Sequence, residues 1–229
     1  MKKLLSGIQV IDFTQYLAGP SATRILSDLG ADVIKIERAP GGDLGRQIHK
    51  VENDQSALHL AASAGKRSMC IEIQHQKGKE IICNLVRQAD VVVENYSPGV
   101  MKKHGLDYDS LRRLKEDLIM CSISGYGQDG PYSKNTSFDI IAQAQSGVMS
   151  MTGEPDGPPT YVGNYFGDPN AGIHGALAIC AALFGRATGG GGQYIDVSQL
   201  ESLVYLLRLF QIPSKPYLHL IRGQDHYAA

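Results

Sequence analysis

The stretch of sequence that decides the fold is residues 8–37, which read IQVIDFTQYLAGPSATRILSDLGADVIKIE. Residues 8–13 are typical of a strand, residues 18–20 predict a turn, and residues 21–29 have the apolar spacing of a helix. Residues 32–37 then predict a second strand. A strand, a helix and a strand within about 30 residues have the size of a parallel βαβ unit.

The same alternation continues along the rest of the chain. Further strands are predicted at 68–73, 90–96, 118–124 and 193–197, and further helices at 77–89, 109–116, 138–146, 168–186 and 198–211. Strands that alternate with helices predict an α/β fold, with an open, mostly parallel, Rossmann-like sheet and helices on both faces. We assign residues 1–211 to one large domain, and we interpret residues 212–229, which lose this periodicity, as a linker.

Composition and charge exclude several classes of protein. The 22 lysine and arginine residues and 23 aspartate and glutamate residues give a formal net charge of −1, which disfavours a nucleic-acid or membrane-surface partner. The longest uncharged stretch, residues 169–185, is shorter than the ~20 residues that a membrane-spanning helix needs. The 4 cysteines lack CxxC spacing, so we expect neither a metal site nor disulfide bonds. These features predict a cytoplasmic protein.

Glycine and basic residues near the strand ends give only weak indications of a ligand site. The first turn, residues 17–20, lacks the GxGxxG pattern of a dinucleotide site, and the glycine run 189–192 lacks the Lys-Ser/Thr of a phosphate-binding loop. Arg38 and Lys103 follow strands of the predicted parallel sheet, whose carboxyl ends share one edge, so they could converge on an anionic ligand. The alternative is that both are ordinary surface charges.

Asp168 has two interpretations. The Asp168-Pro169 pair fits a helix N-cap that is followed by proline in the first helical position, which requires no function. A helix N-terminus also stabilises an ionised carboxylate, and such a carboxylate suits a nucleophile that attacks an activated acyl group.

Several motifs follow one another in a fixed order along nearly the whole chain. They are Ala18-Gly19-Pro20, residues 29–37 (LGADVIKIE), Lys66-Arg67-Ser68, residues 93–99 (VENYSPG), Ser124-Gly125-Tyr126-Gly127, Gly130-Pro131, Ser146-Gly147 and Gly167-Asp168. In these motifs the chain resembles the large domain of the class III coenzyme A transferases of the CaiB/BaiF type. That family includes formyl-CoA:oxalate and carnitine CoA-transferases and, as a relative, α-methylacyl-CoA racemase.

The resemblance implies a CoA-transferase mechanism. Asp168 would attack the thioester of an acyl-CoA donor and form a mixed anhydride, and a carboxylic acid acceptor would then leave as the new thioester. The substrates would be an acyl-CoA and a carboxylate, with coenzyme A as the carrier and no metal. The residues that would line the coenzyme A site are Ala18, Arg38, Lys66, Arg67, Asn95, Lys103, Phe138 and Asp139.

Departures from the family pattern narrow the expected substrate. The oxalate branch carries glutamine at the position of Leu17, which disfavours a formyl or oxalyl substrate. The racemases carry a catalytic histidine at the position of Phe138, so racemisation is the weaker alternative. Lys103 replaces an arginine of some members and keeps the charge without the bidentate geometry.

Chain length gives the last expectation. Family members continue for nearly as many residues again, through a small domain, and form interlocked homodimers. The chain therefore resembles an N-terminal, truncated portion that ends in the linker toward a missing small domain. The sequence leaves two functions open: a CoA-transferase large domain, or a catalytically idle module that binds coenzyme A or associates with a subunit.

Overall fold

The computed structural model describes residues 3–50, 53 and 55–208. The predicted linker, residues 212–229, and the end of the last predicted helix lie outside the described residues. Within the part of the chain that the structure describes, every helix is too short or too polar to span a lipid bilayer.

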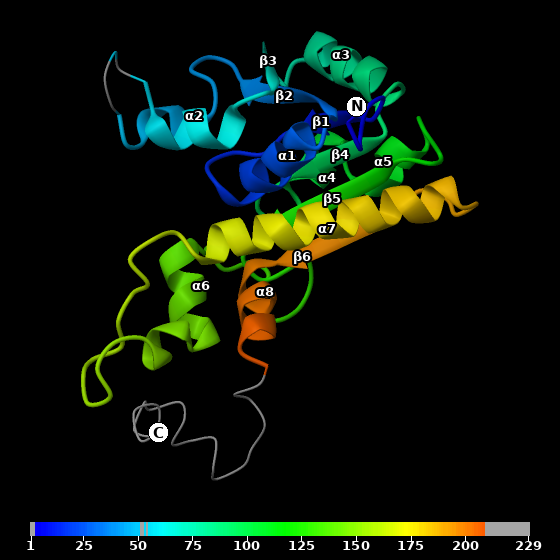
Figure 1. Cartoon of the computed structure of the whole chain (residues 1–229). Coiled ribbons are helices and arrows are strands. Elements are labelled where there is room, and N and C mark those ends of the chain that lie inside the picture. The colour runs from blue at the N-terminus through cyan, green and yellow to red at the C-terminus, as the bar shows by residue number, and fades with distance from the viewer. Residues whose placement is uncertain (1–2, 51–52, 54, 209–229) are drawn as a thin grey trace.

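One open sheet of six parallel strands forms the centre of the molecule (Figure 1). The strands are β1 (Gln9–Asp12), β2 (Asp32–Arg38), β3 (Arg67–Ile71), β4 (Val91–Glu94), β5 (Ile119–Ser124) and β6 (Tyr194–Ser198). Their order in the sheet is β3-β2-β1-β4-β5-β6, and every neighbouring pair is parallel. The predicted Rossmann-like α/β fold is therefore confirmed. The strand order reverses beside β1, where ligands of such sheets bind outside the carboxyl ends of the strands.

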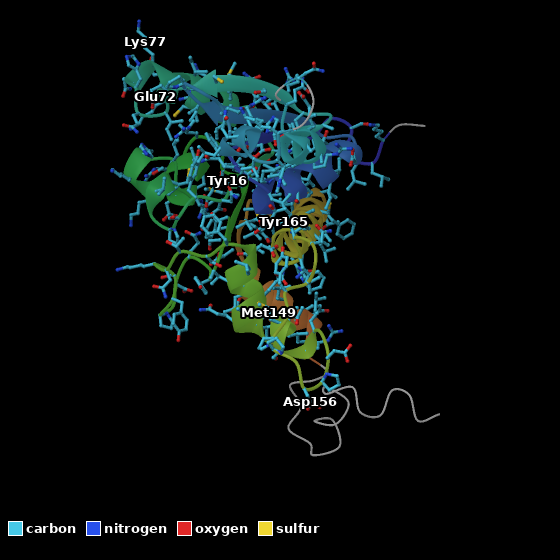
Figure 2. The ribbon with its side chains drawn as sticks, turned by 90° about the vertical axis from the view of Figure 1, so that its left-hand side faces the viewer. Tyr16, Glu72, Lys77, Met149, Asp156 and Tyr165 are labelled. Carbon is cyan, nitrogen blue, oxygen red and sulfur yellow. The ribbon has the colours of Figure 1, made fainter. Side chains whose placement is uncertain are left out.

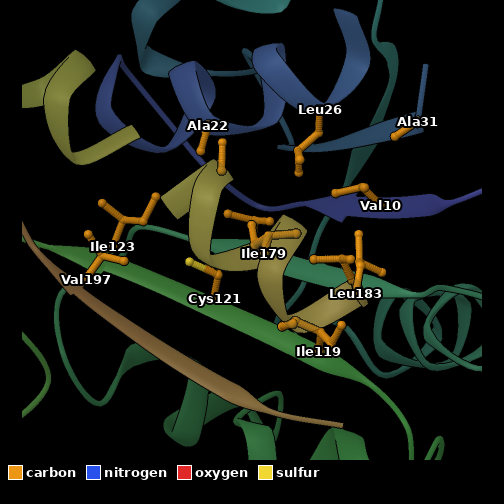
Figure 3. Close-up of a cluster of buried hydrophobic side chains, with 14 of the residues drawn as sticks. Val10, Ala22, Leu26, Ala31, Ile119, Cys121, Ile123, Ile179, Leu183 and Val197 are labelled. Carbon is orange, nitrogen blue, oxygen red and sulfur yellow. The ribbon is translucent and has the colours of Figure 1, made fainter. Parts of the chain in front are cut away.

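Helices cover both faces of the sheet because neighbouring strand residues point in opposite directions. The helices are α1 (Ala18–Asp28), α2 (Ala57–Ser63), α3 (Gln76–Val86), α4 (Val100–His104), α5 (Tyr108–Arg112), α6 (Asp139–Ser146), α7 (Gly167–Ala187) and α8 (Gln199–Leu206). Two short 3₁₀ helices, η1 (Leu44–Gln47) and η3 (Val148–Met151), complete the described elements. Val10 packs with α1 and α7 on one face (Figure 3), whereas Ile11 packs with Ile82 of α3 and Leu111 of α5 on the other.

Helix α7 crosses the sheet face in direct contact with α1 (Figure 1). Two glycines allow α7 to pack closely, Gly172 against α1 and Gly175 against β5. A Cβ atom on Gly172 would lie 2.8 Å from the carbonyl oxygen of Ala18, and one on Gly175 would lie 2.9 Å from Cδ1 of Ile123. The contact fixes the N-terminus of α7 beside the carboxyl ends of β1 and β5, where α6 and α8 also pack.

The structure corrects three local expectations. Residues 18–20 do not form a turn but begin α1, because Pro20 lies in the first helical turn, where a missing N–H costs no hydrogen bond. The helices α2 and α4 were not predicted. Helix α2 begins after Ser56, whose side chain accepts a hydrogen bond from the backbone of His59, and α4 has only five residues between two left-handed glycines.

The close contact between α1 and α7 generates a first prediction. We expect Gly172→Ala to lower the free energy of unfolding by about 1–3 kcal/mol, because the new methyl group meets the backbone of α1. Gly185→Ala is the matched control on the same helix, since a Cβ atom there meets nothing within 4 Å. It should raise the stability by roughly 0.5–1 kcal/mol through helix propensity. Urea unfolding of both variants measures the difference, and equal stabilities would contradict the packing argument.

Candidate active site

Three adjoining cavities open along the carboxyl edge of the sheet. The central cavity, of about 230 Å³, is lined by residues that include Tyr16, Ala18, Asn95, Tyr96, Ser124, Phe138, Asp168 and Gln199. The sheet-edge cavity, of about 380 Å³, is lined by residues that include Gln15, Arg38, Glu72, Tyr96 and His104. The aromatic cavity, of about 240 Å³, is lined by Tyr16, Leu17, Ile48, Leu58, Phe138, Asp139, Ile140, Tyr161, Tyr165 and Asp168.

Shared residues connect the three cavities. Tyr96 lines both the sheet-edge and the central cavity, and Asp168 lines both the central and the aromatic cavity. Tyr16 and Phe138 also lie on the boundary between the last two. In Figure 2, Tyr16 and Tyr165, two residues of the aromatic cavity, lie near the middle of the molecule. The three cavities therefore lie next to one another between Arg38 and the surroundings of Asp168, with Tyr96 and Asp168 on their common boundaries.

Asp168 lies in the first turn of α7 but is not its N-cap. The helix begins at Gly167 and its N-cap is Phe166, so the predicted capping role is wrong. The physical reason lies in α6, where Oδ2 of Asp139 accepts a hydrogen bond of 2.8 Å from the backbone N–H of Asp168. Because the carboxylate of Asp139 accepts a hydrogen bond from this N–H at the start of α7, the side chain of Asp168 is not needed as a cap for the helix.

The side chain of Gln199 forms a hydrogen bond with the carboxylate of Asp168. Gln199 is buried at the start of α8, and its Nε2 donates a hydrogen bond to Oδ1 of Asp168. Its own Oε1 accepts a hydrogen bond of 3.3 Å from Ser137, so the amide orientation is fixed. Among the described residues, Oδ2 of Asp168 accepts no hydrogen bond, which leaves one oxygen of the carboxylate available.

The surroundings of Asp168 change its acidity. Burial and the nearby carboxylate of Asp139 raise the pKa of Asp168, while the hydrogen bond from Gln199 lowers it, and the net value is about 7. Asp168 therefore changes its charge much closer to neutral pH than an ordinary aspartate does. Such a group can act as a nucleophile near physiological pH without being trapped in a strong ion pair.

The expected coenzyme A residues fall into different places. Asn95 lines the central cavity, and its amide makes two hydrogen bonds with the backbone of Gln15, at 2.7 and 2.9 Å. Ala18 and Phe138 line the same cavity, and Arg38 lines the sheet-edge cavity. Lys103 is exposed on α4 and, among the described residues, is not part of the lining of any of the three cavities.

The structure does not place Lys66 or Arg67 at the cavities. The side chain of Lys66 is only 1% exposed, and its Nζ contacts Asp12, Thr23 and the carbonyl oxygen of Pro20 at 3.1, 2.7 and 3.0 Å. Arg67 begins β3 at the opposite edge of the sheet and pairs with Asp32 there.

Lys35 and Asp43, which the sequence analysis missed, support the loop between β1 and α1. The two side chains form a fully buried ion pair of 2.8 Å. Lys35 also donates a hydrogen bond of 2.6 Å to the carbonyl oxygen of Thr14, and Asp43 accepts one of 3.1 Å from the backbone of Tyr16. Tyr16 has a φ of 62°, which is unfavourable for a residue with a side chain, so these contacts stabilise the loop that borders the central cavity.

Lys66 adds a second buried ion pair under the same loop. Burial opposes ionisation of Asp12, but Lys66, Lys35 and the hydroxyl groups of Thr14 and Thr23 outweigh it, so the pKa of Asp12 falls to about 2. The sequence contains no local motif that predicts either ion pair. Lys66 and Asp12 lie 54 positions apart, and only the strand order brings them together. Asp43 follows β2, and the chain must turn back there before its carboxylate reaches Lys35.

The two neighbours of Asp168 generate a prediction for its titration. We expect Gln199→Leu to raise the pKa of Asp168 further, because a donor to the ionised form is lost, and Asp139→Asn to lower it, because a negative charge is removed. NMR titration of ¹³C-labelled aspartate carboxyls measures both shifts, and Asp168→Asn identifies the resonance. Shifts in the same direction in both variants would contradict this account.

The raised pKa also generates a prediction for stability. Between the unfolded value near 3.8 and the folded value of about 7, the native state binds more protons than the unfolded chain at Asp168. Stability from this group is therefore present at low pH and is lost as the pH rises toward 7. We expect Asp168→Asn to gain stability relative to the unchanged protein over that interval, by at most a few kcal/mol, because each pKa unit corresponds to about 1.4 kcal/mol. Urea unfolding at pH 4 and pH 8 tests the change, and a pH-independent difference would contradict it.

Comparison with known proteins identifies relatives that are similar to this chain in sequence and fold. The family model described as CoA-transferase family III matches residues 5–214. The succinate–glutarate CoA-transferase of Agrobacterium fabrum is 44% identical over 87% of this chain and 52% of its own length. The formyl-CoA:oxalate CoA-transferase of Streptomyces avermitilis is 40% identical over 91% of this chain and 51% of its own length.

A solved structure agrees with the sequence comparisons. The crystal structure of a CAIB/BAIF family protein from Brucella suis is 37% identical, with a TM-score of 0.87. The match covers 97% of this chain and 59% of that protein. The chain thus spans about half the length of the curated relatives that it matches. The family model and the solved structure agree, and the chain belongs to CoA-transferase family III.

Proposed function

We propose that this chain supplies the coenzyme A site and the nucleophile of a CoA-transferase that moves coenzyme A from an acyl-CoA to a carboxylic acid. The observation that carries the proposal is the position of Asp168, which lies where the central cavity meets the aromatic cavity. Family membership and the names of the relatives support a transfer reaction between carboxylic acids.

Coenzyme A would lie along the connected cavities. Arg38 and His104 line the sheet-edge cavity and suit the phosphates at the nucleotide end. The pantetheine arm would pass Tyr96 and enter the central cavity beside Asn95. This path would bring the thioester to Asp168. The site thus follows the general rule that ligands of open parallel sheets bind at the carboxyl edge, where the strand order reverses.

The chemistry proposed for Asp168 is covalent catalysis. Its free oxygen would attack the thioester carbonyl, a C–O bond would form, and the C–S bond would break with release of the coenzyme A thiolate. The product is a mixed anhydride between Asp168 and the acyl group. The acceptor carboxylate would then attack the carboxyl carbon of Asp168, form a second mixed anhydride and release the donor acid as a carboxylate. The coenzyme A thiolate would attack the acyl carbonyl of this anhydride, which forms the C–S bond of the new thioester and releases the carboxylate of Asp168.

Three features of the described residues favour this role. The N-terminus of α7 stabilises the negative charge of the reacting carboxylate. Gln199 and Asp139 fix the residue from two directions, so its free oxygen has little freedom to turn away. Phe138 borders the same space with an apolar ring, which cannot serve as the proton-transfer base that a racemase needs.

Trapping of the acyl enzyme tests this proposal. Incubation with an acyl-CoA followed by hydroxylamine should convert Asp168 to a hydroxamate, with release of free thiol, and peptide mass spectrometry locates the label. Asp168→Asn is the control that should abolish the label, while Asp139→Asn should retain it. A label that persists in Asp168→Asn would refute the assignment. Binding of coenzyme A without any label would favour the alternative of an idle binding module.

The remaining expectations stay predictions. They concern the domain boundary at residue 211, the interlocked homodimer of a full-length protein and the cytoplasmic location.

A further inference from the structure

The aromatic cavity has Asp168 in its lining and is more apolar than the central and sheet-edge cavities. Tyr16, Leu58, Ile140 and Tyr165 present mainly carbon atoms to it. Its volume of about 240 Å³ is close to the lower end of the range for small-molecule sites. A group attached to a thioester carbonyl at Asp168 would extend into this space when coenzyme A occupies the central cavity.

The charged groups among the described residues that line the aromatic cavity are carboxylates, and its other polar groups are tyrosine hydroxyls. The hydroxyl of Tyr165 is 2.8 Å from Nε2 of His49, so it already has a hydrogen-bond partner. The carboxylate of Asp139 is buried and accepts hydrogen bonds from Gln143 and from the backbone of Asp168. Among the described residues that line the cavity, there is no lysine or arginine.

We infer that the aromatic cavity is the acyl subsite and that it selects an apolar acyl group, a short or medium-length chain or a single ring, over one that ends in a second carboxylate. This inference rests on the proposed function, because the cavity can hold the acyl group only if the thioester lies at Asp168.

The physical argument compares a methyl end with a carboxylate end. A methyl or methylene group gains free energy when it leaves water for an apolar lining. A carboxylate in the same place loses its hydration, finds no lysine or arginine among the described lining residues and lies near the carboxylate of Asp139. The inference distinguishes this chain from the relatives described above, whose names refer to succinate, glutarate and oxalate.

Butyryl-CoA and succinyl-CoA form a matched pair of probes. Both carry four-carbon acyl groups, and they differ only in a terminal methyl or carboxylate. We expect butyryl-CoA to bind at least about tenfold more tightly than succinyl-CoA. Equilibrium dialysis with Asp168→Asn, which cannot form the anhydride, measures both dissociation constants and that of free coenzyme A.

Two neighbouring isoleucines on α6 provide the matched variants. Ile140 and Ile141 are 50% and 39% exposed, and only Ile140 lines the aromatic cavity. Ile140→Arg introduces a cation for the distal carboxylate and should reduce or reverse the preference for butyryl-CoA. Ile141→Arg adds the same charge to the same helix and should leave the preference unchanged.

The outcomes separate this inference from the proposed function. Tighter or equal binding of succinyl-CoA would overturn the inference while leaving coenzyme A binding intact. Equal effects of the two arginine variants would also overturn it, because the selection would then not arise in the cavity. If neither free coenzyme A nor either thioester binds, the proposed function fails and the inference fails with it.

Discussion

The hydrogen bond between the backbone N–H of Asp168 and the side chain of Asp139 is the contact on which the candidate site depends. It joins the start of α7 to the start of α6, two helices that are separated by a long loop. Because a buried side chain satisfies the helix end, Asp168 need not turn back on its own backbone. The same contact places the carboxylate of Asp139 near that of Asp168. One contact therefore helps to set both the position of Asp168 and its raised pKa.

Groups on three helices raise or lower the pKa of Asp168. The N-terminus of α7 and the amide of Gln199 on α8 favour the ionised form, whereas burial and Asp139 on α6 oppose it. A carboxylate with a strongly lowered pKa, such as Asp12 between two lysines, would be a poor nucleophile because its charge is already neutralised. The protein thus holds Asp12 and Asp168 in opposite electrostatic environments, which lower the pKa of the first and raise that of the second.

Much of the fold could be predicted because its signals are local. Alternating strands and helices are visible in runs such as residues 8–37, and all six predicted strands are present. Asp168 could be found by resemblance, but its surroundings could not be predicted. Gln199 and Asp139 meet it only after β5 and β6 pair and α6 packs beside α8. Lys66 has the sequence position of a ligand residue, yet its ammonium group is occupied by Asp12.

The two buried ion pairs under the loop from β1 to α1 have a consequence for how the protein responds to ionic strength. The side chains of Lys35 and Lys66 are buried away from solvent. Mobile ions therefore hardly screen their attraction to Asp43 and Asp12. Arg38 is exposed at the sheet edge, and its attraction to any anion weakens as salt is added. Added salt would therefore weaken the attraction of Arg38 to the phosphates of the proposed coenzyme A ligand, while the loop that borders the central cavity keeps its shape.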